Sequence, residues 1–231
     1  MTETAKPPAR DPYALPDVSG LRVGVLGGTG EQGRGLALRW ANAGLPVTIG
    51  SRDGHKAAVL AGELGLGIVG TDNATCAAAN DVVVVAVPWA GHEELLTSLR
   101  SELAGKIIID CVNPLGFDKQ GSFALPVEQG SAAQQAEAIL TESIVTAAFH
   151  HLSAVSLLDL SVFDLAMDTL VLGDHRDATD TVAALANLLP GVRGIYGGRL
   201  RNAHQVEAMT ANLISINRRY KSHAGVRVTD V

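Results

Sequence analysis

The feature that most constrains this chain is a run of glycines between an apolar segment and a helical one. Residues 21–27 read Leu-Arg-Val-Gly-Val-Leu-Gly, a β-type run, and residues 28–33 read Gly-Thr-Gly-Glu-Gln-Gly, which is the pattern G-x-G-x-x-G. A helical segment at residues 33–43 follows, and Gly44 is placed to end it. This order predicts a phosphate-binding turn at the start of a parallel α/β sheet.

Each glycine of the pattern has a distinct expected role. Gly28 permits a tight turn after the strand, and Gly30 removes a Cβ that would block a pyrophosphate. Gly33 lets the helix lie close to the strand, so that backbone N–H groups and the helix dipole face the phosphates. The alternative is a purely structural turn, since the chain has 25 glycines. The flanking strand and helix favour a dinucleotide site.

The rest of the chain repeats the strand–helix alternation, which predicts right-handed crossovers and a doubly wound parallel sheet of the Rossmann type. Further strands are expected at residues 47–50, 68–70, 81–87, 106–110, 144–149 and 169–172. Further helices are expected at residues 53–64, 74–79, 131–140, 178–189 and 203–220, with a loop at 111–130. We expect an N-terminal arm at residues 1–19, a nucleotide-binding domain at 20–150 and a smaller C-terminal α/β domain at 151–231.

Composition excludes several other classes of protein. Hydrophobic residues make up 47% of the chain and charged residues 18%, which fits a globular protein with a sizeable core. The net charge of -6 gives no reason to expect nucleic-acid or membrane binding, although residues 193–231 hold seven Lys/Arg against two acids. That basic region either binds an anionic ligand or forms a solvated helix face. Two cysteines, no metal-ligand cluster and no apolar signal segment predict a soluble cytoplasmic protein without a metal.

The end of the second strand favours NADP over NAD. NAD-binding proteins usually place an Asp or Glu there to bind the ribose 2′-OH. Here the strand ends Thr-Ile-Gly-Ser-Arg, with no acid before Asp53. Arg52 is suited to hold a 2′-phosphate, with Ser51 donating a hydrogen bond and Lys56 adding charge. The alternative is that both cations are merely solvated.

Two loops are expected beside the nicotinamide, because ligands of open α/β sheets lie beyond the carboxyl ends of the strands. Val87, Pro88 and Trp89 follow one strand, and Asn113 and Pro114 follow the next. Trp89 either forms a wall of the pocket or belongs to the core. Asn113 either binds the carboxamide or forms a turn.

The segment LRVGVLGGTGEQGRGLALRWANAGLPVTIGSRDGHKA resembles the opening of F420-dependent NADP reductases. The likeness continues through Val-Pro-Trp at residues 87–89 and IVTAAFHHLSA at residues 144–154, and covers roughly residues 21–220. It implies that Thr29, Gly30, Glu31 and Gln32 line the NADP phosphates, and that Ser51, Arg52 and Lys56 surround the 2′-phosphate. The proline-rich leader departs from family members that begin directly at the first strand.

The resemblance also implies a deazaflavin site. His150 aligns with a family histidine that contacts the deazaflavin, and Leu152 and Ala154 lie beside the stacked rings. Whether His150 or His151 points inward stays open, and from the residues alone the two form a core or loop pair. The C-terminal domain would contribute to this deazaflavin cleft and to contacts between subunits.

The implied activity is a reversible, direct hydride transfer between C5 of reduced coenzyme F420 and C4 of NADP. The reacting carbons must approach to about 3–3.5 Å, and the protein supplies orientation and a dry cleft, with His150 polarising or steadying the deazaflavin. One alternative is an NADPH-dependent reductase of an imine, a ketone or a ferric chelate. Another is a redox sensor that binds NADP without turnover. The apolar stretch at residues 152–172 suggests a homodimer.

Overall fold

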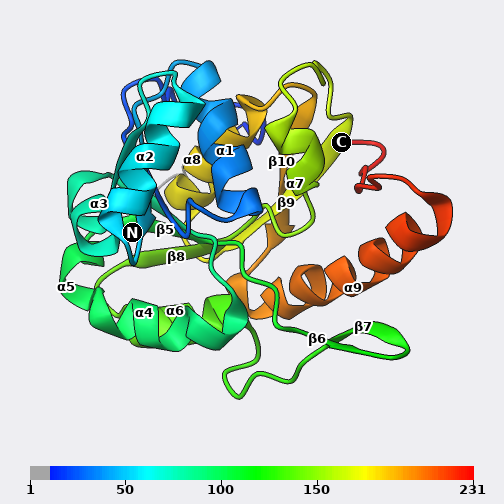
Figure 1. Ribbon diagram of the computed structural model, residues 1–231. Coiled ribbons are helices and arrows are strands. Elements are labelled where there is room, and N and C mark those ends of the chain that lie inside the picture. Colours follow the sequence, from blue (N-terminus) through cyan, green and yellow to red (C-terminus); the bar gives the residue numbers. More distant parts are fainter. Residues whose placement is uncertain (1–10) are drawn as a thin grey trace, which may run out of the picture.

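The computed structural model describes residues 11–231 and contains one large sheet with helices on both faces (Figure 1). Within these residues the sheet has eight strands in the order β10-β9-β8-β5-β4-β1-β2-β3. Their bounds are β1 (Val23–Leu26), β2 (Val47–Ser51), β3 (Val69–Asp72), β4 (Val82–Val85), β5 (Ile107–Asp110), β8 (Ile144–Ala147), β9 (Met167–Gly173) and β10 (Val192–Gly198). The first six of these strands in the chain pair in parallel, which confirms a doubly wound α/β fold.

The helices divide between the two faces of the sheet. They are α1 (Glu31–Asn42), α2 (Gly54–Leu64), α3 (Asn73–Ala79), α4 (His92–Ser98), α5 (Arg100–Leu103), α6 (Ala132–Ile139), α7 (Ala154–Leu158), α8 (Arg176–Asn187) and α9 (Ala203–Tyr220). Side chains of α1, α2, α7 and α8 join one apolar cluster, and those of α3, α4, α5 and α6 join the other. Figure 1 shows α4 and α6 together on one side of the sheet, with α1 on the other.

Burial explains why the central strand reads as an unbroken apolar run. All four valines of β4 are at most 1% exposed. They lie between β1 and β5 and under helices on both faces. A strand covered on both sides cannot alternate polar and apolar residues, because neither face meets water. The sequence prediction of a strand at residues 81–87 is therefore confirmed, although β4 is shorter at both ends.

The sheet continues past residue 150. Strand β9 pairs antiparallel with β8, and β10 pairs parallel with β9. The carboxyl ends of β9 and β10 therefore point away from the side of the sheet on which the glycine turn lies, which is formed by the carboxyl ends of the other strands. The division into domains at residue 150 stays a prediction, and any C-terminal unit shares this sheet.

Several elements differ from the sequence-based expectations. The segment 111–130, expected to be a loop, contains a hairpin of β6 (Leu115–Asp118) and β7 (Gly121–Ala124). The hairpin extends from the body beside α9, and Ser122 Oγ donates to the carbonyl of Ala211 at 3.0 Å (Figure 1). The elements α4, α5, α7 and β10 were not predicted, whereas α9 has the expected bounds.

Of the predicted N-terminal arm, residues 11–19 belong to the described part, and residues 1–10 lie outside it. Residues 11–19 form no helix or strand, but Val18 is buried and Leu15 packs against the same apolar cluster. The arm is therefore tied to the body at its end. No helix in residues 11–231 is long and apolar enough to cross a membrane.

Candidate active site

The glycine turn connects β1 to α1, and three of its glycines are required by close approaches. Gly27 has φ of +76°, a left-handed conformation that glycine adopts without strain. A Cβ on Gly28 would lie 2.6 Å from Cβ of Ile49 in β2, and one on Gly33 would lie 2.8 Å from the carbonyl oxygen of Gly27. The close packing expected at Gly33 is confirmed. The tight turn expected at Gly28 falls instead on Gly27, and Gly28 lets the turn pass over β2.

The same turn is open where a phosphate would approach. A Cβ on Gly30 would meet a single protein atom within 4 Å, the Gly27 carbonyl oxygen at 3.3 Å. Helix α1 begins at Glu31, and no side chain of residues 11–231 caps its first turn. Backbone N–H groups at a helix N-terminus with no protein acceptor favour an anion. These observations fit the pyrophosphate of a dinucleotide.

The residues after β2 keep two cations free. The Asp53 carboxylate caps α2, accepting from the Lys56 backbone N–H at 3.0 Å. The Asp53 N–H donates in turn to Ser51 Oγ at 3.2 Å. Arg52 and Lys56 are exposed, and neither forms an ion pair within residues 11–231. The acid nearest to Arg52 is thus engaged in capping, which leaves the guanidinium available to an added phosphate.

The loop after β4 forms a partly covered wall. Trp89 is half-buried and lies in a short 3-10 helix (Trp89–Gly91), with its ring centroid 5.4 Å from that of His92. Val87 packs against the second apolar cluster, and Pro88 is exposed. Trp89 packs against the second apolar cluster and stays partly exposed, and its place in the wall of a nicotinamide pocket stays a prediction.

The loop after β8 has a strained backbone at its centre. Phe149 has φ of +65°, a left-handed conformation that is rare for a bulky residue. The loop is held by the Phe149 N–H donating to Thr169 Oγ1 at 3.0 Å, and by Gln32 Nε2 donating to the Phe149 carbonyl at 3.0 Å. The Phe149 ring meets Trp40 edge-on at 5.4 Å. Such strain persists only where the surroundings fix the conformation, and it is concentrated at functional sites.

The next carbonyl, that of His150, is fixed by two further segments. Asn113 Nδ2 donates to it at 2.9 Å, and Thr210 Oγ1 of α9 donates at 3.1 Å. The side-chain amide of Asn113 is therefore engaged within the protein rather than facing outward as a free carboxamide ligand. Thr169 and Thr210 were not predicted, because their contribution depends on contacts between distant segments.

The two histidines of this loop differ in their partners. His151 Nε2 donates to the backbone carbonyl of Asp168 at 2.7 Å. His150 is 4% exposed, and its Nε2 has no hydrogen-bond partner within the described residues. Burial lowers the pKa of His150 to about 4, with a smaller contribution from the neighbouring His151, so the ring is neutral at pH 7. His151 Nδ1 is likewise buried without a hydrogen-bond partner in residues 11–231, so each ring has one unpaired nitrogen that fits a ligand group, and which histidine faces the cofactor stays a prediction.

Leu152 and Ala154 lie where the loop enters α7, and α7 is fixed to α1 by one side chain. Leu152 is buried and Ala154 is half-buried at the first residue of the helix. Arg39 of α1 is 2% exposed and donates to the backbone carbonyls of this region. The acceptors are the carbonyls of Ser156, Leu157, Asp159 and Val162, at 2.6–3.0 Å.

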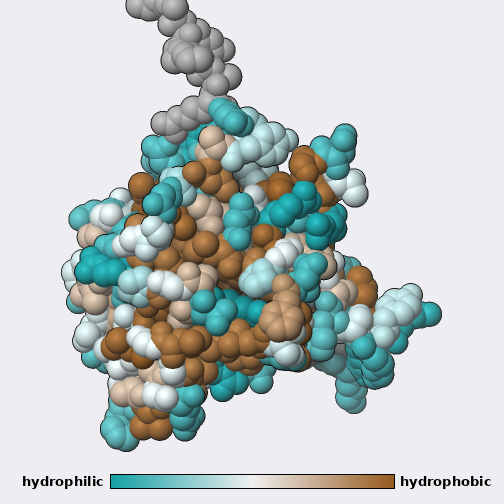
Figure 2. Space-filling view, turned by 90° about the horizontal axis from the view of Figure 1, so that it is seen from above, coloured by the Kyte–Doolittle hydropathy of each residue, from teal (hydrophilic) through white to brown (hydrophobic). Residues whose placement is uncertain are grey.

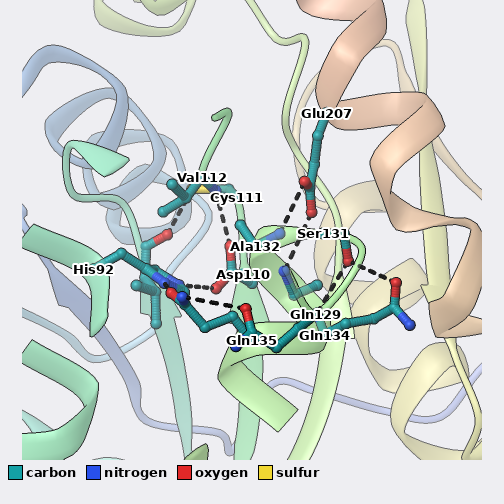
Figure 3. A network of polar contacts seen from close by, with 12 residues as sticks. His92, Asp110, Cys111, Val112, Gln129, Ser131, Ala132, Gln134, Gln135 and Glu207 are labelled. Carbon is teal, nitrogen blue, oxygen red and sulfur yellow. Dashed lines mark hydrogen bonds and ion pairs between the residues drawn. The ribbon is translucent and has the colours of Figure 1, made fainter. Parts of the chain in front are cut away.

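A buried polar network lies beneath the loop after β5 (Figure 3). His92 Nε2 is 2.6 Å from Asp110 Oδ2, and its Nδ1 is 2.8 Å from Gln135 Oε1. Glu207 of α9 accepts from the backbone N–H groups of Ala132 and Ala133 at 3.0 and 3.2 Å. Burial raises the pKa of Glu207 to about 7, and the charge of Asp110 adds to the shift. None of His92, Asp110, Gln135 or Glu207 was predicted as a site residue.

The fold and its open glycine turn define a dinucleotide-binding protein of the Rossmann type. Residues 22–114 match the family model described as "NADP oxidoreductase coenzyme F420-dependent". The F420-dependent NADP reductase of Methanothermobacter thermautotrophicus is 40% identical over 91% of this chain and 96% of its own length. The corresponding reductase of Methanothermobacter marburgensis is 38% identical over 91% of this chain and 99% of its own.

A solved structure gives the same answer. A putative F420-dependent NADP-reductase from Arthrobacter sp. FB24 superposes with a TM-score of 0.79 at 26% identity, covering 91% of this chain and 100% of that one. The chain therefore belongs to the family of F420-dependent NADP reductases, as the resemblance in its sequence indicated. The cofactors implied by the family are NADP and coenzyme F420.

Proposed function

We propose that this protein transfers a hydride directly and reversibly between reduced coenzyme F420 and NADP. One observation carries the proposal beyond family membership. The hydrogen bond from Gln32 Nε2 to the Phe149 carbonyl joins the glycine turn to the His150 loop. The two predicted cofactor sites are thus built on adjacent segments at one edge of the sheet, where two planar rings have a common place to stack.

The residues of the glycine turn hold the dinucleotide. The N–H groups of Glu31 and Gln32 at the start of α1 face the pyrophosphate, and the missing Cβ of Gly30 leaves room for it, whereas that of Gly28 lets the turn pass over β2. Arg52, with Ser51 and Lys56, surrounds the 2′-phosphate through charge-assisted hydrogen bonds. Thr29, which is half-buried, and Gly33 complete this part of the site.

The loop at residues 149–154 holds the deazaflavin. His150 presents a neutral ring with a free nitrogen, which steadies or polarises the deazaflavin without placing a charge against it. Leu152 and Ala154 supply apolar contact, and Val87, Pro88, Trp89 and Pro114 border the nicotinamide. Asn113 acts by fixing the His150 carbonyl rather than by touching the nicotinamide.

The bound coenzymes supply the chemistry: a hydride passes from C5 to C4, and one proton is released to water. The protein orients the two rings and excludes water, so no nucleophile or metal is needed. The strained Phe149 backbone, held by Gln32 and Thr169, contributes by fixing the conformation of the loop that carries His150.

The test is spectrophotometric. Mixing the protein with oxidised coenzyme F420 and NADPH should bleach the visible band of the deazaflavin, and reduced coenzyme with NADP should restore it. Absence of any change, with the protein folded and NADP bound, would overturn the proposal. NADPH consumption only with an imine, a ketone or a ferric chelate would assign a different acceptor, and tight NADP binding without any exchange would indicate a sensor.

We also propose a cytoplasmic homodimer with the C-terminal part, residues 151–231, supplying contacts between subunits. Apolar residues are spread over the face seen from above (Figure 2). Among the large apolar side chains, Phe163 is 83% exposed and Val155 is 56% exposed, both in or after α7. Size-exclusion chromatography with light scattering should give twice the mass of the 24.0 kDa chain. A single species with the mass of one chain would reject the dimer.

A further inference from the structure

His92 occupies a position that the hydride-transfer proposal does not use. It is the first residue of α4, its side chain is fully buried, and it follows Trp89 by three residues. Both ring nitrogens face oxygen atoms, Asp110 Oδ2 at 2.6 Å and Gln135 Oε1 at 2.8 Å (Figure 3). The imidazolium is the form that donates both bonds. Burial lowers the pKa of His92, but the charge and hydrogen bond of Asp110, the bond to Gln135 and the charge of Glu207 together outweigh it, and the net shift is upward.

The second oxygen of Asp110 leads toward the site. Asp110 ends β5, and its Oδ1 accepts the backbone N–H of Val112 at 3.0 Å. The following residue, Asn113, donates to the His150 carbonyl at 2.9 Å. A continuous chain of bonds therefore connects α6, through His92 and Asp110, to the loop predicted to hold the deazaflavin.

We propose that His92 is a positioning residue for hydride transfer, which acts by orienting the Asp110 carboxylate and through it the turn at residues 111–114. The inference rests on the proposed function and adds to it. With Asp110 fixed, the turn at Val112 and Asn113 holds the His150 carbonyl in one position. Without His92, Asp110 is a buried carboxylate lacking its main partner, and it must rotate to find another.

The surroundings explain why a histidine is needed here. Asp110 is fully buried, so water does not replace a lost partner. The other buried carboxylate nearby, Glu207, is occupied by the N–H groups of Ala132 and Ala133. A histidine ring spans the space between Asp110 and Gln135, which lie on different elements, and satisfies both. A shorter or apolar side chain leaves one of them unpaired.

Two substitutions separate positioning from simple stability. His92→Gln places an amide near the Nε2 position and keeps a donor for Asp110, whereas His92→Asn places it near the Nδ1 position and keeps only the contact with Gln135. In single-turnover stopped flow, His92→Asn should slow hydride transfer about tenfold or more, because misplaced rings lose rate steeply. His92→Gln should stay within about threefold of the wild type, and both variants should bind NADP within about threefold of it.

The control is Asn80→Ala, which removes a buried bond to the Cys76 carbonyl (2.7 Å) at the opposite, amino end of β4. It should lower the melting temperature and leave the transfer rate unchanged.

Equal rates for His92→Asn and His92→Gln, whether both normal or both slow, would overturn the positioning role. If His92→Asn does not fold, Asp110→Asn is decisive: it keeps an oxygen for Val112 but replaces the one that faces His92, so hydride transfer should slow about tenfold or more, and a rate within about threefold of the wild type would overturn the inference. A wild type that transfers no hydride at all would instead refute the proposed function.

Discussion

The two halves of the candidate site are assembled differently. The dinucleotide half, residues 27–33 and 51–56, comes from one β-α-β unit, whose strands β1 and β2 pair directly. The deazaflavin half is the loop at residues 149–154. Side chains from four distant segments hold it: Gln32, Asn113, Thr169 and Thr210.

This difference has consequences for how each half responds to change. In the dinucleotide half, five of the thirteen residues are glycine and the backbone forms the turn, so a substitution acts by steric exclusion or by removing a charge. In the deazaflavin half, the backbone is strained and several hydrogen bonds share the task of holding it. Loss of one bond there should be a small, graded effect, and loss of one glycine in the other half a large one.

The largest effect is expected for Gly28→Val in the dinucleotide half. Even a Cβ at this position would lie 2.6 Å from Cβ of Ile49, so the turn and α1 must move away from β2. We expect a loss of about 3 kcal/mol of stability and roughly 100-fold or more in NADP affinity, by chemical denaturation and calorimetry. Gly62→Ala is the control, because a Cβ at Gly62 meets nothing within 4 Å and alanine favours the helix. Unchanged NADP binding by Gly28→Val would contradict the backbone-built site.

Arg52→Ala should have the next largest effect, confined to one nucleotide. Removal of the guanidinium should weaken NADP binding by about 1.5–3 kcal/mol, the range for hydrogen bonds to charged groups, and leave NAD binding nearly unchanged. Isothermal titration with both nucleotides measures the difference, and exposed Arg100→Ala is the matched control. An equal loss for NADP and NAD would remove the 2′-phosphate assignment.

The pH dependence of stability tests the buried state of His150 in the deazaflavin half. Its pKa is lowered to about 4 in the folded protein, so the unfolded chain takes up a proton at higher pH than the folded one. The stabilisation is complete above about pH 6.5 and is lost as the pH falls from there toward 4. Between pH 7 and pH 5, the free energy of unfolding measured with urea should fall by about 2 kcal/mol more in the wild type than in His150→Asn.

The control for this measurement is His55→Asn, which replaces an exposed histidine of α2. It should leave the pH dependence of unfolding as it is in the wild type. The same slope for His150→Asn and the wild type would mean that His150 is accessible to water, against the buried site described above.

The smallest effect is expected for Thr210→Val, which removes one of the bonds to the His150 carbonyl. Because Asn113 still donates to that carbonyl, stability should fall by about 1 kcal/mol and the KM for coenzyme F420 should rise only about three- to tenfold. NADP affinity should not change. Ser215→Ala, on the same helix and bonded only within it, is the control. A loss of stability as large as that expected for Gly28→Val would contradict the proposed difference between the two halves.

The contrast also explains what could be predicted from the sequence. The glycine turn was found because its constraints are local: a strand, three glycines at fixed spacing and a helix. The positive φ at Gly27 and the contact of Gly28 with Ile49 were not, since both depend on how the turn crosses β2. The resemblance pointed to His150, but its free Nε2 and the partner of His151 depend on the folded loop.

The missed elements have physical reasons too. Strand β10 contains three glycines, which carry no hydrophobic signal, and it is identified by its pairing with β9. The hairpin of β6 and β7 is exposed at Phe117 and Phe123, so it lacks the burial that makes strands recognisable. Leu96 of α4, Leu103 of α5 and Leu99 between the two helices follow at helical spacing, a signal that was available in the sequence. The network of His92, Asp110 and Gln135 needs the helices to be placed first.

The central claim is that the chain brings the two coenzymes together so that hydride passes directly between them. The most direct test uses reduced coenzyme F420 carrying deuterium at both C5 positions, with NADP in ordinary water. The account predicts one deuterium at C4 of each NADPH formed and no hydrogen from solvent there, measured by mass spectrometry. NADPH carrying solvent hydrogen at C4 would show that the rings do not meet in one dry cleft, and would contradict the account.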